Sequence, residues 1–306
     1  MKKRVNLLLS HIRKLMIGAL LLSALLWTSS LQLPQAAAMP ETENAVDTAL
    51  LAHVEAWTAQ LSAQPAFKSW QGATLDISAL GPGTHSWMAS VIQHKKTVGY
   101  LVVHATQSGG FILGEYGLGD YLYNLTTLQQ SLQRLELIPS TTTSTPLYIH
   151  PLLSVWKISG KATAYTDAMS GEAVPLTASL WNAEASQELK LIQDETPPMT
   201  STAGITKAVS NPSFSPYEKL QWLTDAPVSK AESKAFIKVL HILDKKKHLT
   251  YTAARFNGEM LYVWSATGYH SWDNGAVYVA LETDELGESQ RYVPLSLLAE
   301  LGDFYR

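Results

Sequence analysis

The strongest constraint on the fold is a series of short alternating and β-branched segments that follow one another closely after Pro65. Turn-forming residues separate them, at Gly81-Pro82-Gly83, Lys95-Lys96-Thr97 and Ser108-Gly109-Gly110. Connections this short join antiparallel neighbours, because parallel strands need a long crossover. The sequence therefore predicts a four-stranded antiparallel meander, with strands at residues 73–80, 86–94, 98–106 and 111–116.

Helices are expected on either side of this meander. Between residues 44 and 62, apolar side chains recur at spacings of three and four, and Asn44 is the predicted N-cap. A second amphipathic helix is expected at 126–137. Residues 140–146 (STTTSTP) predict a hinge, and 147–158 and 163–166 predict further strands. These segments define a first unit at residues 44–194.

The second unit is predicted at residues 217–306, behind a linker at 195–216 that is rich in Pro, Ser and Thr. It opens with helical segments up to residue 246. Asn257-Gly258 and Asn274-Gly275 predict tight hairpin turns, since both dipeptides favour positive φ. A short helix from Pro294 should end at Gly302. The predicted fold class is α+β, with two units that are each an antiparallel sheet with packed helices behind an N-terminal signal sequence.

The first 38 residues have the pattern of a secretory signal. Five basic residues precede or flank an apolar run at 15–27, and Ala36-Ala37-Ala38 matches the small-residue site that signal peptidase cleaves. An uncleaved membrane anchor is the alternative, because the apolar stretch extends to Leu33 with a few polar residues. Both interpretations put the remaining chain outside the cytoplasm, either secreted or on the outer face of the cytoplasmic membrane.

Charge and cysteine content exclude several functions. The chain has 23 basic and 26 acidic residues, and five of the basic ones lie in the first 38, so the rest has 18 against 26, a net charge of −8. This balance disfavours nucleic acid, and it leaves the membrane as a partner only through the N-terminal segment. The chain contains no cysteine, which excludes thiol chemistry and disulfides. An exported chain without cysteine is typical of Gram-positive bacteria.

The first candidate site is the glycine-rich stretch around residues 109–121. Glu115 and Asp120 lie there together with Tyr116 and Tyr121. As a surface loop, it could bind a sugar or peptide with its aromatic faces, or its two carboxylates could share acid–base work. Alternatively, the glycines form bends and the tyrosines pack within a half-buried sheet.

The second candidate site is Gly268-Tyr269-His270-Ser271-Trp272-Asp273, where exposed aromatics beside a His–Asp pair would orient a ligand. Here the alternative is that the aromatics cover the sheet. Three histidines, His85, His94 and His104, fall on the predicted meander, but their spacing does not indicate a metal site, and no cofactor is indicated. Neither an HExxH nor a GxSxG motif is present, so no hydrolase nucleophile can be named.

Residues 165–175 (YTDAMSGEAVP) resemble the strand–turn–strand of PepSY-like domains and protease propeptides. Asp167 should accept hydrogen bonds from turn amides, and Gly171 should supply a positive φ. The resemblance implies a binding or inhibitory module without catalytic residues. The general layout is also similar to exported proteins of Bacillus-type bacteria.

Two functions follow from these patterns. The first is a non-catalytic binding module of the cell surface or envelope that holds or inhibits an exported protein or peptide, such as a protease, by adding strands to a sheet edge. The alternative is a cell-wall or glycan hydrolase that uses Glu115 and Asp120. A third interpretation, an envelope scaffold, requires the retained anchor.

Overall fold

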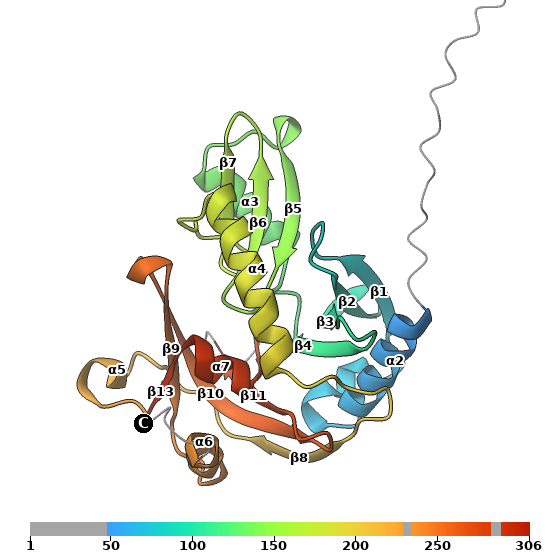
Figure 1. The fold of residues 1–306 in the computed structure, drawn as a ribbon, viewed down its shortest axis with the longest axis vertical. Helices are drawn as coiled ribbons and strands as arrows, with labels where there is room; N and C mark the ends of the chain where they lie inside the picture. The colour runs from blue at the N-terminus through green and yellow to red at the C-terminus, as the bar shows by residue number, and fades with distance from the viewer. Residues whose placement is uncertain (1–47, 229–233, 283–288) are drawn as a thin grey trace, which may run out of the picture. The chain divides into compact units, whose positions relative to one another are not determined.

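The computed structural model describes residues 48–228, 234–282 and 289–306 (Figure 1). The signal segment and the predicted N-cap Asn44 lie outside these residues. The described chain combines helices with antiparallel sheets, so the predicted α+β class is confirmed. No helix in the described ranges has both the length and the hydropathy needed to cross a bilayer.

The described strands form a ten-stranded sheet and a three-stranded sheet. In the large sheet the order is β1-β2-β3-β4-β12-β11-β10-β9-β13, with β8 also paired to β10. Its strands are β1 (Thr74–Ala79), β2 (Ser86–Gln93), β3 (Lys96–Ala105), β4 (Phe111–Leu118), β8 (Ile205–Ser210), β9 (Thr250–Arg255), β10 (Met260–Trp272), β11 (Val277–Glu282), β12 (Arg291–Pro294) and β13 (Asp303–Tyr305). The first four strands form the predicted meander.

The two predicted units do not each form a separate sheet. Strand β12 pairs with β4 through Arg291 opposite Gly117 and Tyr292 opposite Tyr116, so one sheet takes strands from both units. Strand β8 lies inside the predicted linker at 195–216. A Cβ on Gly268 would lie 2.1 Å from the Val209 carbonyl oxygen, so this glycine allows β8 to approach β10.

One face of the meander is covered by α2 (Thr48–Ser62) and the 3₁₀ helix η1 (Pro65–Trp70). Trp57, Phe67 and Trp70 are fully buried there. The helical spacing at 44–62 predicts this for Trp57, whereas η1 with Phe67 and Trp70 was not predicted. A Cβ on Gly99 in β3 would lie 2.3 Å from the Trp70 ring. Glycine in this strand therefore makes room for a ring rather than for a bend.

The small sheet consists of β5 (Thr143–Tyr148), β6 (Ser154–Ser159) and β7 (Thr163–Asp167). Helix α3 (Leu125–Arg134) packs on the face that carries Trp156, and α4 (Ala178–Glu195) packs on the face that carries Val155 (Figure 1). Strand β5 begins inside the predicted hinge at 140–146, after the 3₁₀ helix η2 (Pro139–Thr141). The sequence patterns did not indicate α4.

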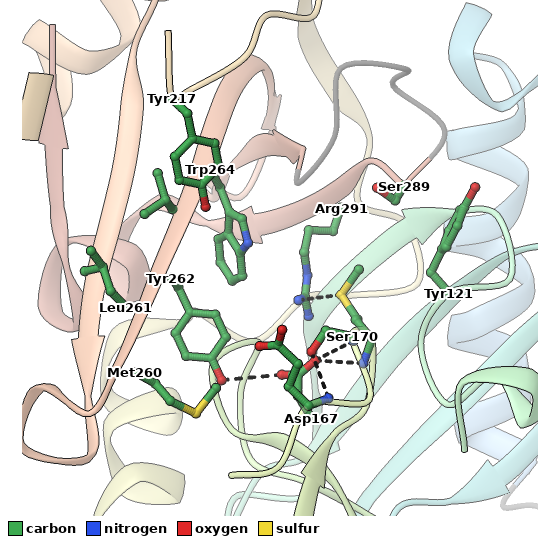
Figure 2. A pocket seen from close by; sticks show the side chains of 13 residues that line it. Tyr121, Asp167, Ser170, Tyr217, Met260, Leu261, Tyr262, Trp264, Ser289 and Arg291 are labelled. Carbon is green, nitrogen blue, oxygen red and sulfur yellow. Dashed lines mark hydrogen bonds between the residues drawn. The ribbon is translucent and has the colours of Figure 1, made fainter. Parts of the chain in front are cut away.

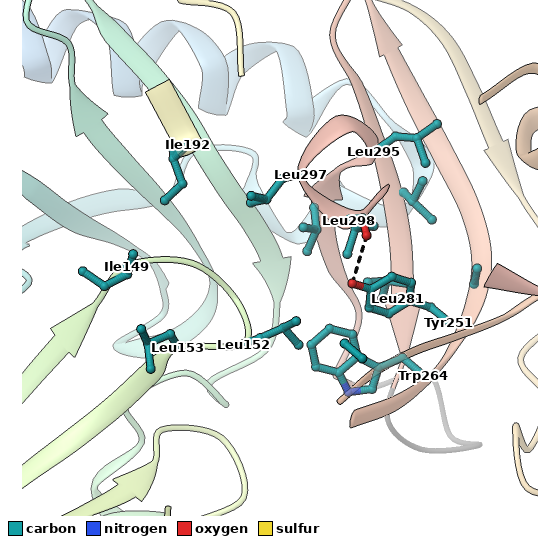
Figure 3. Close-up of a cluster of buried hydrophobic side chains, with 14 of the residues drawn as sticks. Ile149, Leu152, Leu153, Ile192, Tyr251, Trp264, Leu281, Leu295, Leu297 and Leu298 are labelled. Atoms are coloured by element: carbon teal, nitrogen blue, oxygen red, sulfur yellow. Dashed lines mark hydrogen bonds between the residues drawn. The ribbon is translucent and has the colours of Figure 1, made fainter. Parts of the chain in front are cut away.

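The two sheets share one hydrophobic core. Leu152 and Leu153, in the turn between β5 and β6, belong to the same buried cluster as residues of α7 (Leu295–Leu301) and of β9–β11 (Figure 3). The Tyr251 hydroxyl donates to the Leu298 carbonyl at 3.1 Å within this cluster. Helix α4 reaches the same cluster through Ile192, so the small sheet is anchored by packing as well as by the chain.

The second half also contains α5 (Gln221–Thr224), α6 (Lys234–Asp244) and the 3₁₀ helix η3 (Phe256–Gly258). Both predicted Asn-Gly turns are present, with positive φ at Asn257, Gly258 and Gly275. Gly302 follows α7 as predicted but is extended (φ −166°) rather than left-handed. A Cβ there would lie 2.3 Å from the Thr252 carbonyl oxygen, which explains the glycine by close packing.

Candidate functional site

A buried ion pair joins the two parts of the large sheet. Glu115 in β4 is 0% exposed and Arg291 in β12 is 2% exposed. Nη2 of Arg291 donates to both Glu115 oxygens, at 2.6 and 2.8 Å, and Nε donates to Oε2 at 3.2 Å. This geometry lets the planar guanidinium satisfy both carboxylate oxygens.

Arg291 also contacts the turn that follows β5 and the turn that follows β7. Its Nη1 donates to the Pro151 carbonyl at 3.4 Å and approaches the Met169 sulfur at 2.9 Å. The guanidinium lies 5.3 Å from the centre of the Trp264 ring. A single side chain thus contacts β4, β10 and the turns that follow β5 and β7.

Burial and ion pairing shift the pKa values of Glu115 and Arg291 in opposite directions. Burial raises the pKa of Glu115, while Arg291 and nearby tyrosines oppose that shift. For Arg291, burial alone would lower the pKa, but the Glu115 carboxylate outweighs it and the pKa is raised. The guanidinium therefore stays protonated, and its charge is balanced inside the protein.

The two carboxylates of the first candidate site lie in different environments. Glu115 is enclosed and bound to Arg291, whereas Asp120 is exposed on the turn after β4 and accepts a hydrogen bond from Asn124 at 2.9 Å. Tyr116 is buried, and Tyr121 is partly buried. The stretch is thus a core strand followed by a turn, and Glu115 is not available to a substrate at the surface.

Three predicted ligand-binding aromatics, Tyr116, His270 and Trp272, are buried together with Tyr292. The Tyr116 hydroxyl lies 2.9 Å from Nδ1 of His270, and the Tyr116 and Tyr292 rings stack at 4.9 Å. The expectation of exposed aromatics was therefore wrong at these positions, because β12 brings β4 and β10–β11 into one sheet. Burial lowers the pKa of His270 to about 4.

Tyr269 points to the other face of β10. It is 1% exposed, and its hydroxyl donates to Asp244 at 2.7 Å. Lys207 lies 5.1 Å above its ring and pairs with the same Asp244. Tyr269 therefore holds β8 and α6 against β10.

Two histidines form buried polar contacts on the face that carries Glu115. Nδ1 of His104 lies 2.7 Å from the Ser86 hydroxyl, and burial, with a smaller contribution from His150, lowers the pKa of His104 to about 4. His150 accepts the Leu152 amide at Nδ1, so its other nitrogen carries the proton and donates to Glu188 at 2.5 Å. Glu188 also binds Arg255. Within the described ranges, no three metal-ligating side chains lie close enough together to hold an ion.

The turn after β7 has the predicted geometry. Oδ1 of Asp167 accepts the amides of Met169 and Ser170 at 2.9 and 2.8 Å, and Gly171 has φ +70°. A Cβ on Gly171 would lie 2.7 Å from the Ser131 hydroxyl. Asp167 and Gly171 therefore fix this turn against α3.

This turn forms one wall of a cavity of about 280 Å³, which we call the Asp167 cavity (Figure 2). The opposite wall is residues 260–264 of β10. Tyr121, Tyr217, Ser289 and Arg291 complete the lining, together with Met169, Ser170 and Glu172 of the turn. Figure 2 shows Tyr262 directed toward Asp167, with its hydroxyl 3.4 Å from Oδ2.

Of the predicted site residues, only Tyr121 and Asp167 line this cavity. Sequence reasoning missed Tyr217, Tyr262, Trp264 and Arg291. The alternation of aromatics at Tyr262 and Trp264 was a usable signal, because two aromatics on one strand next to an Asn-Gly turn mark a half-exposed surface.

No protein-family model matches the chain, and a search of curated proteins finds no significant match. The class established by the fold is an α+β protein with one large and one small antiparallel sheet.

Proposed function

We propose that the protein is an exported, non-catalytic binding module of the cell surface or envelope that holds an exported protein or peptide in the Asp167 cavity. The observation that carries this proposal is the lining of the cavity. Exposed side chains with apolar surface, Tyr217 (56%) and Leu261 (51%), form its rim, and the rest of the lining combines apolar side chains with charged ones. Concave sites with this composition are typical of ligand binding.

Two of the charged groups in the cavity, Asp167 and Arg291, already have partners within the protein. Asp167 holds two amides of its own turn, and the Arg291 charge is already used by Glu115. A general acid or base needs a titratable group that can reach the substrate. The glycan-hydrolase alternative depends on Glu115, which is fully buried and paired, so we do not carry that alternative further.

The turn that resembles PepSY-like domains is the turn that lines the cavity. In that resemblance the partner is a secreted protease, which makes an exported protease a suitable first partner to look for. The predicted export of the chain is part of the same proposal, since the partner must be in the same compartment.

Site-specific photo-cross-linking tests the proposal. A benzophenone amino acid replaces Tyr217 at the cavity rim, or Leu125 on α3 as a control that is similarly exposed (67%). In the native host, irradiation should attach one exported protein or peptide to the Tyr217 probe and not to the Leu125 probe. Attachment of cell-wall glycan alone, or the same products from both probes, would reject the proposal.

A further inference from the structure

The lining of the Asp167 cavity carries two carboxylates. Asp167 and Glu172 lie on the turn, and neither has a cationic partner among the described residues. Arg291 is a cationic residue of the lining, but both oxygens of Glu115 already accept its hydrogen bonds. Among the described residues, the lining therefore has two carboxylates without an ion-pair partner, although Oδ1 of Asp167 accepts two amides of its own turn.

A second and independent feature is the indole N–H of Trp264. This side chain is 4% exposed, and no hydrogen bond from its nitrogen to any described residue is found. The indole nitrogen itself keeps some exposure to the cavity. A buried tryptophan normally finds an acceptor for this donor. Here the free donor lines the cavity, next to Arg291 (Figure 2).

We propose that the Asp167 cavity binds a peptide segment through a lysine or arginine side chain, whose charged group lies beside Asp167 and Glu172 while a backbone carbonyl accepts the Trp264 N–H. This inference rests on the proposed function and specifies its ligand. Met169, Met260 and Tyr262 supply apolar surface for the methylene stem of such a side chain. The exposed rim residues Tyr217 and Leu261 suit apolar neighbours on the peptide, which a free amine would not offer.

The test uses the full chain and three blocked pentapeptides, Ala-Leu-X-Leu-Ala, in which X is lysine, norleucine or glutamate. Norleucine keeps the stem of lysine without its charge. Titration calorimetry should show the lysine peptide binding about tenfold more tightly than the norleucine peptide, with the glutamate peptide weakest. The preference for lysine should shrink as salt is raised, because exposed charges are screened.

Matched variants locate the effect. Glu172→Gln removes one cavity charge at an exposed position, and Glu55→Gln removes one charge from an exposed position on α2. We expect the first variant to lose most of the lysine preference and the second to keep it. Trp264→Phe, which keeps an aromatic ring but removes the N–H together with part of the indole surface, should weaken all three peptides together.

Different failures have different meanings. If the three peptides bind equally and Tyr217→Ala weakens all of them, the cavity binds peptides and only the basic-side-chain inference is overturned. If no peptide binds at millimolar concentration, or if binding ignores every cavity variant, the proposed function is overturned as well.

Discussion

Removing either member of the buried pair Glu115–Arg291 should destabilise the protein far more than removing both. Arg291→Met leaves a carboxylate that is 0% exposed without its donors, and Glu115→Met leaves a guanidinium that is 2% exposed without its acceptor. Breaking a buried pair in this way costs roughly 3–5 kcal/mol, because an uncompensated charge stays inside. Methionine fits both sites in length, so cavity formation adds little.

The double variant Glu115→Met/Arg291→Met removes both charges and should cost only about 0–3 kcal/mol relative to the unmodified protein. The coupling free energy in the double-mutant cycle should therefore be about 3 kcal/mol or more. The measurement is urea unfolding of the full chain at pH 7.5, followed by tryptophan fluorescence and circular dichroism. If a single variant does not fold, recovery of folding in the double variant shows the same coupling.

The exposed pair Lys207–Asp244 provides a matched control. Its N–O distance of 2.8 Å is close to that of the buried pair, but the side chains are 51% and 38% exposed. Surface pairs contribute about 0–1 kcal/mol, so the same cycle there should give a coupling below about 1 kcal/mol. Equal coupling in the two cycles, or single variants at Glu115 and Arg291 that are as stable as the double, would refute the reasoning.

Three further predictions concern the rest of the fold. His104 and His270 have folded-state pKa values of about 4, below the unfolded value of about 6.5, so the unfolded state takes up protons first as pH falls. Each histidine should therefore remove about 2 kcal/mol of stability between pH 7.5 and 5, and urea unfolding across this range should show a shallower slope in His104→Gln. Gly99→Ala should cost about 1–3 kcal/mol because its Cβ would meet Trp70 at 2.3 Å, whereas Gly110→Ala, with 3.4 Å of room, should be nearly neutral in thermal unfolding. Asn124→Ala removes the side chain that accepts the Thr126 amide at 2.7 Å, and the loss of this N-cap of α3 should cost about 1 kcal/mol in the same measurement.

Sequence patterns correctly predicted the elements whose contacts are made between residues close together in the chain. The meander, both Asn-Gly turns and the hydrogen bonds of Asp167 depend on residues within a few positions of one another. Helix α4 was missed because only Trp181 and Ile192 of its eighteen residues are buried, which leaves too weak an apolar stripe. Strand β5 begins four residues before the predicted strand at 147–158, because the run of Thr and Ser at 140–146 predicts a hinge although threonine favours strands.

The candidate site could not be found by local reasoning, because its residues come from distant parts of the chain. Glu115 and Arg291 are 176 positions apart, and only two residue pairs join β4 to β12. The glycines around Glu115 suggested a loop, but Gly114 and Gly117 make room for the rings of His104 and Tyr100. A usable signal was the isolation of each charge within an apolar strand, since buried charges are almost always paired.

The pairing of Glu115 with Arg291 explains why the Asp167 cavity can be negative although Arg291 is part of its lining. If Arg291 were free, it would offset Asp167 or Glu172 at the cavity wall. Glu115 accepts hydrogen bonds from Arg291 and neutralises its charge. The arginine can therefore pack against Trp264 and Met169 in the lining without repelling a cationic ligand. If the proposed ligand binds, stability and ligand preference depend on different carboxylates, Glu115 for the first and Glu172 for the second. For that reason Glu172→Gln should alter peptide preference without changing the urea midpoint, whereas Glu115→Met should lower the midpoint first.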